Sequence, residues 1–244
     1  MQSDGRSKAS QRVNSDHISL AAQGAWNGLH QFQVLHLVPT SYQLPAMGFA
    51  IVNSQLPTRK PRIAITLGDP SGVGPELIAK LLSNIANQDR ADIVLLADHS
   101  ELQLAIKDAG GVHVPTSNIQ ILDDGTAPHY HTTRAEVSKA SGARCIHQLK
   151  RALKLVQASE VDAIVFGPLN KSSLKKAGMT EEDELRWFAK QLDFKGTTSE
   201  INIAGELWTG RVTSHIGIED VAARITKRSV LKAIELLHRL RYVS

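Results

Sequence analysis

The sequence predicts an α/β protein built around a mostly parallel sheet with helices on both faces. Continuous apolar runs at residues 93–97 and 161–166 are typical of strands that are covered on both faces. Segments with apolar residues at helical spacing alternate with such runs along the chain. The chain has 244 residues, of which 42% are hydrophobic, so it can bury the core of one large or two small domains.

From residue 62 onward, strands and helices are predicted in alternation. The predicted strands lie at residues 62–67, 93–97, 119–122 and 161–166. The predicted helices between them lie at residues 75–88, 101–109 and 141–158. The first of these helices has one apolar face, formed by Leu77, Ile78, Leu81, Leu82 and Ile85. This order favours parallel strands joined by helical crossovers.

The last third of the chain is less regular. Helices are predicted at residues 182–191 and 229–240, and strands at residues 201–203 and 211–214. In the last helix, the side chains expected to face inward are Val230, Ile234 and Leu237.

The first 58 residues differ from the rest. They are rich in Gln, Ser, His and Asn, and the first glutamate of the chain is Glu76. We interpret residues 1–58 as a poorly ordered extension or as sequence upstream of the natural start. In the second case, Met47 is an alternative start residue. A targeting peptide is less favoured, because Asp4 and Asp16 interrupt the basic, Ser-rich character of such segments.

The composition favours a soluble protein with a small anionic ligand. The formal net charge is +4, which is too weak and too scattered to indicate nucleic-acid binding. No apolar run approaches the roughly 20 residues that span a bilayer, and the N-terminus lacks the pattern of a secretory signal. We therefore expect no membrane association and a cytoplasmic location.

Cysteine and histidine patterns predict no metal site by themselves. The single cysteine, Cys145, excludes a disulfide within the chain and is expected as a small buried residue on a helix. The segment His129-Tyr130-His131 has no acidic residues at ligand spacing. A polar loop is therefore favoured there over a metal site.

A glycine-rich loop at residues 68–76 joins the first predicted strand to the first predicted helix. Its spacing, G-x-x-x-G-x-G, matches neither the dinucleotide fingerprint nor the phosphate loop that ends in Gly-Lys-Ser/Thr. Gly72 and Gly74 are expected to adopt positive φ angles, and Asp69 and Glu76 to place carboxylates at the rim. Open α/β sheets bind ligands at such junctions. On spacing alone, a structural turn and a ligand-binding loop both remain open.

The loop sequence Gly68-Asp69-Pro70-Ser71-Gly72-Val73-Gly74-Pro75-Glu76 resembles the opening signature of the 4-hydroxythreonine-4-phosphate dehydrogenase family. These enzymes are related to the isocitrate and isopropylmalate dehydrogenases. Further segments that resemble the family are Phe166-Gly167-Pro168-Leu169-Asn170-Lys171, Val212-Thr213-Ser214-His215 and Ile218-Glu219-Asp220-Val221. The resemblance covers roughly residues 62–243.

The resemblance implies a dehydrogenase that oxidises the secondary alcohol of a phosphorylated hydroxy acid. Its cofactors would be NAD or NADP and a divalent metal such as zinc, magnesium, manganese or cobalt, which stabilises the developing alkoxide. Loss of carbon dioxide can follow. The family also implies a homodimer, a first α/β domain at residues 59–175 and the start of a second, dimer-forming domain at residues 176–244.

The resemblance also assigns roles to individual residues. His215 would be a metal ligand, and Lys171 would be catalytic beside the substrate or, alternatively, a solvated loop lysine. Asp220 would orient the region of His215 or cap a helix. Contacts to substrate are implied for Asn170 and Thr180. Contacts to the cofactor are implied for Gly68, Asp69, Gly72, Gly74 and Glu76.

Two departures from the family pattern change the expectation. Met179 stands where the family has a substrate-binding histidine, which suggests a different substrate. The carboxylates at residues 181–184 are interpreted as a solvated helix start. The family's Asn-Pro-His and Tyr-His-Asp-Gln segments, each with a metal-binding histidine, have no match in the sequence. We therefore expect weak metal binding and little dehydrogenase activity. The alternative is a non-catalytic protein that binds a phospho-ligand or a partner.

Overall fold

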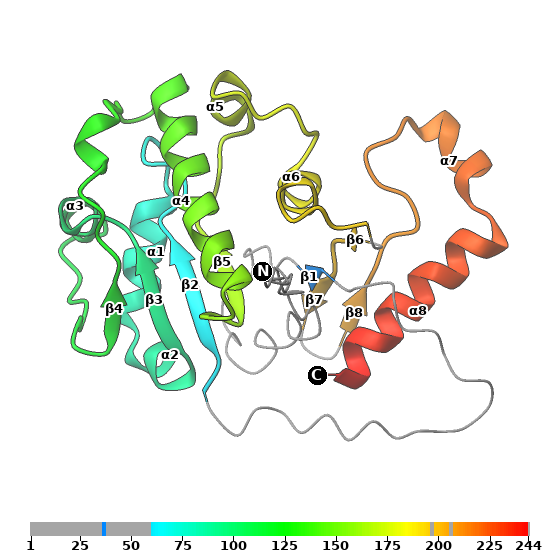
Figure 1. Cartoon of the computed structure of the whole chain (residues 1–244), viewed down its shortest axis with the longest axis horizontal. Coiled ribbons are helices and arrows are strands. Elements are labelled where there is room, and N and C mark those ends of the chain that lie inside the picture. The colour runs from blue at the N-terminus through cyan, green and yellow to red at the C-terminus, as the bar shows by residue number, and fades with distance from the viewer. Residues whose placement is uncertain (1–35, 38–59, 196–197, 205–206, 244) are drawn as a thin grey trace, which may run out of the picture.

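The computed structural model describes residues 36–37, 60–195, 198–204 and 207–243 (Figure 1). The interpretation of residues 1–58 lies outside these ranges, apart from strand β1 (His36–Leu37). This strand pairs antiparallel with β6 (Thr198–Ser199). Within the described ranges, no helix has the length and apolar character needed to cross a membrane.

Four parallel strands form the main sheet (Figure 1). In spatial order these are β4 (Ile119–Ile121), β3 (Asp92–Leu96), β2 (Arg62–Thr66) and β5 (Ala163–Phe166). At the end of β2, Thr66 lies opposite both Leu96 and Phe166. The central strands therefore end together, and their carboxyl ends form one edge of the sheet. The predicted parallel sheet is confirmed.

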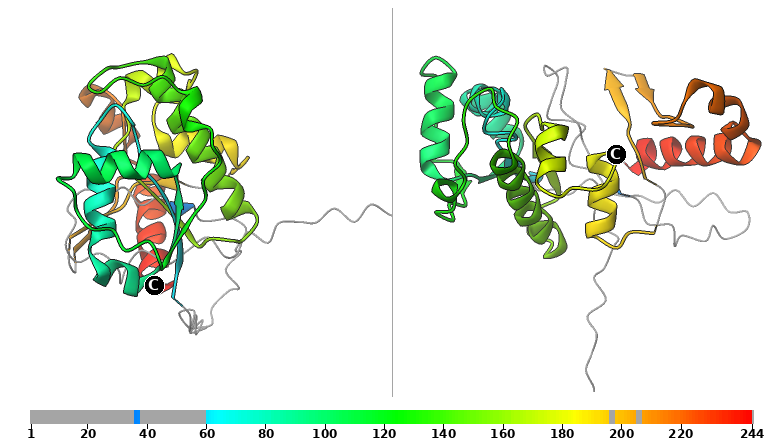
Figure 2. Two further views of the ribbon diagram at one scale, coloured as in Figure 1. Left: turned by 90° about the vertical axis from the view of Figure 1, so that its left-hand side faces the viewer. Right: turned by 90° about the horizontal axis from the view of Figure 1, so that it is seen from above.

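Helices cover both faces of this sheet (Figure 2). Helices α1 (Gly74–Ser83) and α3 (His99–Asp108) lie on one face, and α4 (Lys139–Gln157) lies on the other. Helix α2 (Ile85–Arg90) follows α1, α5 (Lys171–Lys176) packs against α4, and α6 (Glu184–Gln191) comes next along the chain. Because side chains alternate along a strand, Ile65 and Leu95 pack toward α1 and α3 while Ala64 and Val94 pack toward α4. The prediction of helices on both faces is also confirmed.

The single helix predicted at residues 75–88 is wrong in one respect, because the chain breaks at Asn84. The backbone of Asn84 is extended, and its side chain accepts a hydrogen bond from the Ala86 amide at 3.1 Å. Asparagine favours such caps over helix interiors. Beyond the break, Ile85 points away from the core and is 56% exposed. Leu77, on the first helix, is also exposed.

The C-terminal part contains β7 (Asn202–Ala204), β8 (Leu207–Thr209), α7 (Ile218–Arg224) and α8 (Lys227–Val243). Strands β7 and β8 pair antiparallel, so the strand predicted at residues 201–203 is confirmed within one residue. The strand predicted at residues 211–214 is wrong, because pairing with β7 ends at Thr209 and the chain then leaves the sheet. The pattern predicts neither α5 nor α7, which have only 6 and 7 residues.

Helix α8 contains the predicted helix at residues 229–240, but a different face is buried. Leu236 is 8% exposed, whereas Ile234, expected to face inward, is 56% exposed. Val230 and Leu237 are partly buried. In the described ranges, large exposed apolar side chains gather in this part of the chain, at Leu207, Val212, Ile216, Ile218, Ile225, Leu231 and Ile234.

The hairpin β7–β8 and helix α8 lie to one side of the main sheet in Figures 1 and 2. Helix α6 packs with the sheet and α4, since Trp187 and Phe188 share an apolar cluster with Leu149 and Phe166. The predicted domain division at residue 175 stays a prediction.

Helices α4 and α5 approach most closely at Gly142, and this contact generates a test. A Cβ atom at Gly142 would lie 1.9 Å from the Ser173 carbonyl oxygen. Gly142→Ala should therefore lower the free energy of unfolding by about 2 kcal/mol or more, although Gly→Ala normally stabilises a helix. Urea denaturation followed by circular dichroism measures the change.

The matched control is Gly72→Ala, where the added Cβ would meet nothing closer than 3.6 Å. That variant should stay within about 1 kcal/mol of the parent. Equal stability of the two variants would contradict the inferred contact between α4 and α5.

Candidate functional site

The glycine loop crosses the carboxyl edge of the sheet between β2 and α1. Its backbone touches the loop after β5, since the Asp69 amide donates to the Pro168 carbonyl at 2.9 Å. A Cβ atom at Gly74 would lie 2.4 Å from the Leu67 carbonyl oxygen. Gly74 is therefore needed for close approach of two backbone segments. The expected positive φ at Gly72 and Gly74 is wrong, because Gly68, with φ 81°, is the loop glycine in that region.

Asp69 anchors this loop. Its carboxylate is 4% exposed and accepts hydrogen bonds from the Ser71 amide at 2.8 Å and from the Ser141 hydroxyl. Ser141 lies in the first turn of α4, and its hydroxyl is also hydrogen-bonded to the Ser71 hydroxyl at 2.9 Å. The expectation that Asp69 lies at the rim is therefore wrong, because its side chain points inward and ties the loop to α4.

Glu76 lies at the start of α1 and is partly exposed. It forms ion pairs with Lys80 at 2.6 Å and with Arg134 at 3.9 Å. The hydrogen bond from Lys80 lowers the pKa of Glu76. The expected carboxylate near the rim is present, and it already has cationic partners within the protein.

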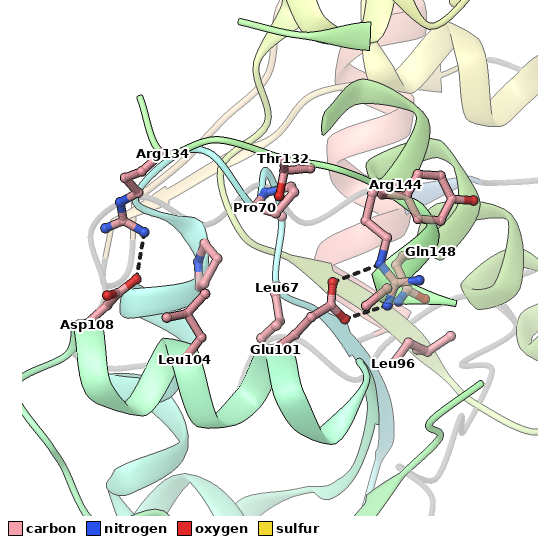
Figure 3. A pocket seen from close by; sticks show the side chains of 14 residues that line it. Leu67, Pro70, Leu96, Glu101, Leu104, Asp108, Thr132, Arg134, Arg144 and Gln148 are labelled. Atoms are coloured by element: carbon pink, nitrogen blue, oxygen red, sulfur yellow. Dashed lines mark hydrogen bonds and ion pairs between the residues drawn. The ribbon is translucent and has the colours of Figure 1, made fainter. Parts of the chain in front are cut away.

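A cavity of about 100 Å³ opens beside the loop (Figure 3). It lies between the glycine loop, α3, α4 and the segment that leads to α4. Its lining combines apolar groups with polar groups and consists of Leu67, Gly68, Pro70, Pro75, Leu96, Glu101, Leu104, Asp108, Ala127, Tyr130, Thr132, Arg134, Arg144 and Gln148. Among the residues predicted to contact a cofactor, Gly68 alone lines the cavity.

Gln148 gives this cavity an unused hydrogen-bond donor. The side chain is 6% exposed, and its Nε2 atom has no hydrogen-bond partner in the structure. The Oε1 atom accepts from Arg151 at 2.9 Å, which fixes the amide orientation. Buried polar atoms are rarely left unpaired, so Nε2 suits an acceptor oxygen of a ligand or a water.

Arg144 forms the polar wall of the cavity. It is 2% exposed and donates to Glu101 at 2.8 Å, to Asp98 at 3.0 Å and to the Thr126 hydroxyl at 2.7 Å. Its guanidinium also lies 5.6 Å from the centre of the Tyr130 ring. Burial opposes the charge, but the two carboxylates dominate and raise the pKa of Arg144.

The segment before α4 is held by two further carboxylates. Asp123 accepts from the backbone amides of His99 and Gly125, each at 2.8 Å, and these bonds lower the pKa of Asp123 to about 2. Asp124 pairs with His147 at 2.7 Å. Although burial opposes it, this contact and bonds from Thr126 hold the pKa of Asp124 well below its usual range.

Sequence reasoning missed this network. The partners of Arg144 at Glu101 and Asp98 lie 43 and 46 residues away. The helical spacing could have indicated that Arg144 and Gln148 point inward, because they share a helix face with the buried Ser141 and Cys145. Cys145 itself matches its prediction, since it is 2% exposed and burial raises its pKa.

The predicted catalytic and substrate residues lie around α5. Asn170 caps this helix, and its side-chain oxygen accepts from the Ser173 amide at 3.0 Å. Lys171 begins the helix and is exposed. Thr180 is exposed and donates to Glu181 at 3.0 Å. Their predicted roles stay predictions.

The residues that follow α5 confirm one expectation only in part. Met179 is 7% exposed and packs in the apolar cluster with Trp187 and Phe188, and the change of substrate inferred from it stays a prediction. The helix start at residues 181–184 is not fully solvated, because Asp183 and Glu184 are 6% and 8% exposed. Asp183 is the N-cap of α6 and accepts from the Arg186 amide at 2.7 Å.

His215, the predicted metal ligand, lies before α7 with a left-handed φ of 55°. Its Nε2 atom is 3.5 Å from Oδ2 of Asp183. An imidazole nitrogen and a carboxylate oxygen are suitable donors for zinc and similar cations. No group of three or more histidine, cysteine or acidic side chains gathers at one point within the described ranges. The predicted role of His215 as a metal ligand stays a prediction.

A parallel sheet whose carboxyl edge carries a glycine loop and a small polar cavity defines an α/β protein of the kind that binds ligands at that edge. Comparison with known proteins identifies the family. A family model described as "Pyridoxal phosphate biosynthetic protein PdxA" matches residues 78–242, and the chain belongs to this family. The resemblance to the 4-hydroxythreonine-4-phosphate dehydrogenase family, first seen in the glycine loop, is confirmed.

Relatives and a solved structure agree with this assignment. The chain is 41% identical to a putative 4-hydroxythreonine-4-phosphate dehydrogenase 2 of Pseudomonas aeruginosa, over 72% of this chain and 56% of that protein. It is 36% identical to a putative 4-hydroxythreonine-4-phosphate dehydrogenase of Pasteurella multocida, over 74% of this chain and 58% of that protein. The crystal structure of a 4-hydroxythreonine-4-phosphate dehydrogenase from Burkholderia phymatum matches with 28% identity and a TM-score of 0.62. The match covers 72% of this chain and 57% of that one. The chain thus spans little more than half the length of these proteins.

The buried arginine generates a stability test. Arg144→Leu leaves Glu101 and Asp98 without their cation, and should lower the free energy of unfolding by about 3–5 kcal/mol. Arg134→Leu is the control, because Arg134 is 47% exposed and its bond to Asp108 should contribute less than about 1 kcal/mol. Urea denaturation of both variants measures the difference. Similar small losses would contradict the role assigned to Arg144.

Asp123 generates a pH test. Its folded pKa of about 2 lies below the ordinary value of 3.8, so its contribution to stability is present above pH 4 and is lost as the pH falls toward 2. Amide exchange of His99 and Gly125, corrected for intrinsic rates, should accelerate over that interval. Asp123→Asn keeps an acceptor oxygen without the charge and should flatten the profile. An unchanged profile in Asp123→Asn would sink this assignment.

Proposed function

We propose that the protein acts as an NAD- or NADP-dependent and divalent-metal-dependent dehydrogenase of a phosphorylated hydroxy acid. The candidate substrates are 4-hydroxythreonine 4-phosphate and the related threonate and erythronate phosphates. Family membership supports this, and a relative from Bordetella bronchiseptica, 29% identical, is named D-threonate 4-phosphate dehydrogenase. The observation that carries the proposal is the cavity at the carboxyl edge of the sheet, with the unpaired Gln148 amide in its wall.

The cavity fits part of a cofactor. At about 100 Å³ it is smaller than sites that enclose a whole drug-sized ligand, so it suits one planar ring or a few waters. Gly68 and Pro70 bring the backbone close to the bound group, and Gln148 offers an N–H donor. Arg134 lies at a partly exposed position of the wall, where it is paired with Asp108 at 2.8 Å. A bound nicotinamide would accept the hydride, while these residues orient it and exclude water.

Lys171 and His215 are proposed to act on the substrate side. A bound divalent cation would stabilise negative charge on the substrate oxygen, and His215 supplies one donor for it. Lys171 is exposed at the start of α5, where its ammonium can hold an anionic group or transfer a proton. Asn170 uses its amide oxygen as the helix cap, and its amide N–H₂ would donate to substrate. A homodimer and a cytoplasmic location belong to the same proposal.

A second candidate is a non-catalytic protein that binds a phospho-ligand or a partner. The observation that favours it is the donor count in the described ranges, where His215 and Asp183 meet without a third side chain of ligand type. Catalytic zinc sites normally have three protein ligands. Metal binding and turnover are therefore expected to be weak for this chain.

The assay combines each candidate phospho-acid with NAD or NADP and with zinc, magnesium, manganese or cobalt. Slow, metal-dependent formation of reduced nicotinamide supports the dehydrogenase, and Lys171→Ala should lower its rate at least 100-fold. The control is Lys175→Ala, which removes another exposed lysine from the same helix. Binding of a phospho-acid without turnover, measured by calorimetry, favours the second candidate. Neither binding nor turnover would contradict both.

A further inference from the structure

The segment between β4 and α4 forms one wall of the cavity, and we call residues 123–134 the strap. Its regular structure is one 3₁₀ turn at Ala127–His129. The strap residues that line the cavity are Ala127, Tyr130, Thr132 and Arg134. Because one short turn cannot fix so long a segment, contacts between side chains decide where this wall lies.

Asp124 attaches the strap to α4. Its Oδ2 atom lies 2.7 Å from Nε2 of His147 and 3.3 Å from Nη1 of Arg151. Its Oδ1 atom accepts from the Thr126 hydroxyl at 2.7 Å. Burial opposes ionisation, but the bonds from His147 and Thr126 hold the pKa of Asp124 well below its usual range. The carboxylate is therefore charged at neutral pH.

The same imidazole also contacts the wall of the cavity. The rings of His147 and Tyr130 have their centroids 5.9 Å apart and are tilted by 41°. Aromatic rings attract one another at about this separation, and a cation beside a ring adds to the attraction. The Arg144 guanidinium already supplies one such cation, 5.6 Å from the Tyr130 ring centroid. His147 thus joins the anchor of the strap to a side chain that lines the cavity.

Within this group, His147 is the side chain whose charge changes near neutral pH. Histidine titrates between about pH 5 and 8, whereas aspartate and arginine keep their charges there. The His147 side chain is 32% exposed, so it exchanges protons with solvent. Asp124 and Tyr130 of the strap contact the imidazole, and the cations that share Asp124 with it are Arg144 and Arg151 of α4. The carboxylate favours the imidazolium, and the two arginines oppose it.

We infer that His147 is a positioning residue whose protonation state sets Tyr130 and, with it, the strap wall of the cavity. The imidazolium attracts both the Asp124 carboxylate and the Tyr130 ring, so the wall is held against α4 at the acidic end of the range. Neutral His147 keeps a hydrogen bond to Asp124 but loses the attraction of charge, so the wall loosens as the pH rises. The inference goes beyond the proposed function, because it concerns the wall that any ligand in the cavity would meet.

The test follows the full chain, with ¹³C in its tyrosine and histidine rings, by NMR from about pH 5 to about pH 8. The chain has three tyrosines, and Tyr130→Phe identifies the Tyr130 signal. This signal should shift with the same midpoint as the His147 ring signal. The Tyr130 amide donates to the Ala127 carbonyl at 3.0 Å. Its exchange, corrected for the intrinsic rate, should accelerate about threefold over the same interval, as the loss of a partly exposed ion pair allows.

His147→Gln keeps a hydrogen-bond donor for Asp124 without a titrating charge, so it should abolish the shift of the Tyr130 signal. The matched control is His99→Gln, which removes the other imidazole paired with the strap, 2.6 Å from Asp123. In the described part of the chain, the imidazole in ring contact with Tyr130 is that of His147. His99→Gln should therefore leave the Tyr130 titration unchanged.

Three outcomes would overturn the proposal. These are a Tyr130 signal that does not titrate with His147, a titration that persists in His147→Gln, and an equal loss of titration in His99→Gln. The comparison of midpoints needs the parent chain and the signal assignments, so it decides the matter even where a variant is unstable. No cofactor, metal or substrate enters the measurement. Its failure therefore leaves the proposed dehydrogenase standing, and absence of turnover leaves the role of His147 standing.

Discussion

The structure depends on the convergence of three backbone segments at the carbonyl of Leu67. Cβ atoms at Gly74 and at Gly167 would each lie 2.4 Å from that oxygen, so any larger residue would force the segments apart. The contact joins the end of β2, the start of α1 and the loop after β5. Asp69 stabilises this contact by accepting a hydrogen bond from Ser141 of α4. The glycines therefore shape the edge of the sheet chiefly by allowing close approach.

The buried charge of Arg144 is the second constraint, and it follows from the first. Once Ser141 fixes the start of α4, Arg144 must face inward one turn later, against α3. Removing a guanidinium from water is favourable only when its donors are satisfied, and Glu101, Asp98 and Thr126 satisfy them. The same bonds hold the segment before α4 across the cavity. One ion cluster thus links helix packing to the wall of the candidate site.

The sequence predicted local features well and spatial partnerships poorly. The parallel sheet follows from continuous apolar runs such as residues 93–97, and the glycine loop was placed correctly at a strand–helix junction. The break at Asn84 and the inward direction of Asp69 depend on caps and contacts that periodicity does not encode. The pairing of Asp183 with His215 is hidden for the same reason, because only the folded chain brings the two side chains together.

The two candidate loci differ in the charge that they can accept. Beside the glycine loop, Gln148 offers an unpaired N–H donor, whereas Arg134 is already paired with Asp108, so this locus suits an acceptor oxygen. At the start of α6, Asp183 presents a carboxylate oxygen toward an imidazole, so this locus suits a cation. In the proposed dehydrogenase, the substrate would bring anionic groups, and a bound divalent cation would stabilise the developing alkoxide. The Gln148 amide and the Asp183 carboxylate are therefore the two groups of opposite preference on which the proposal draws.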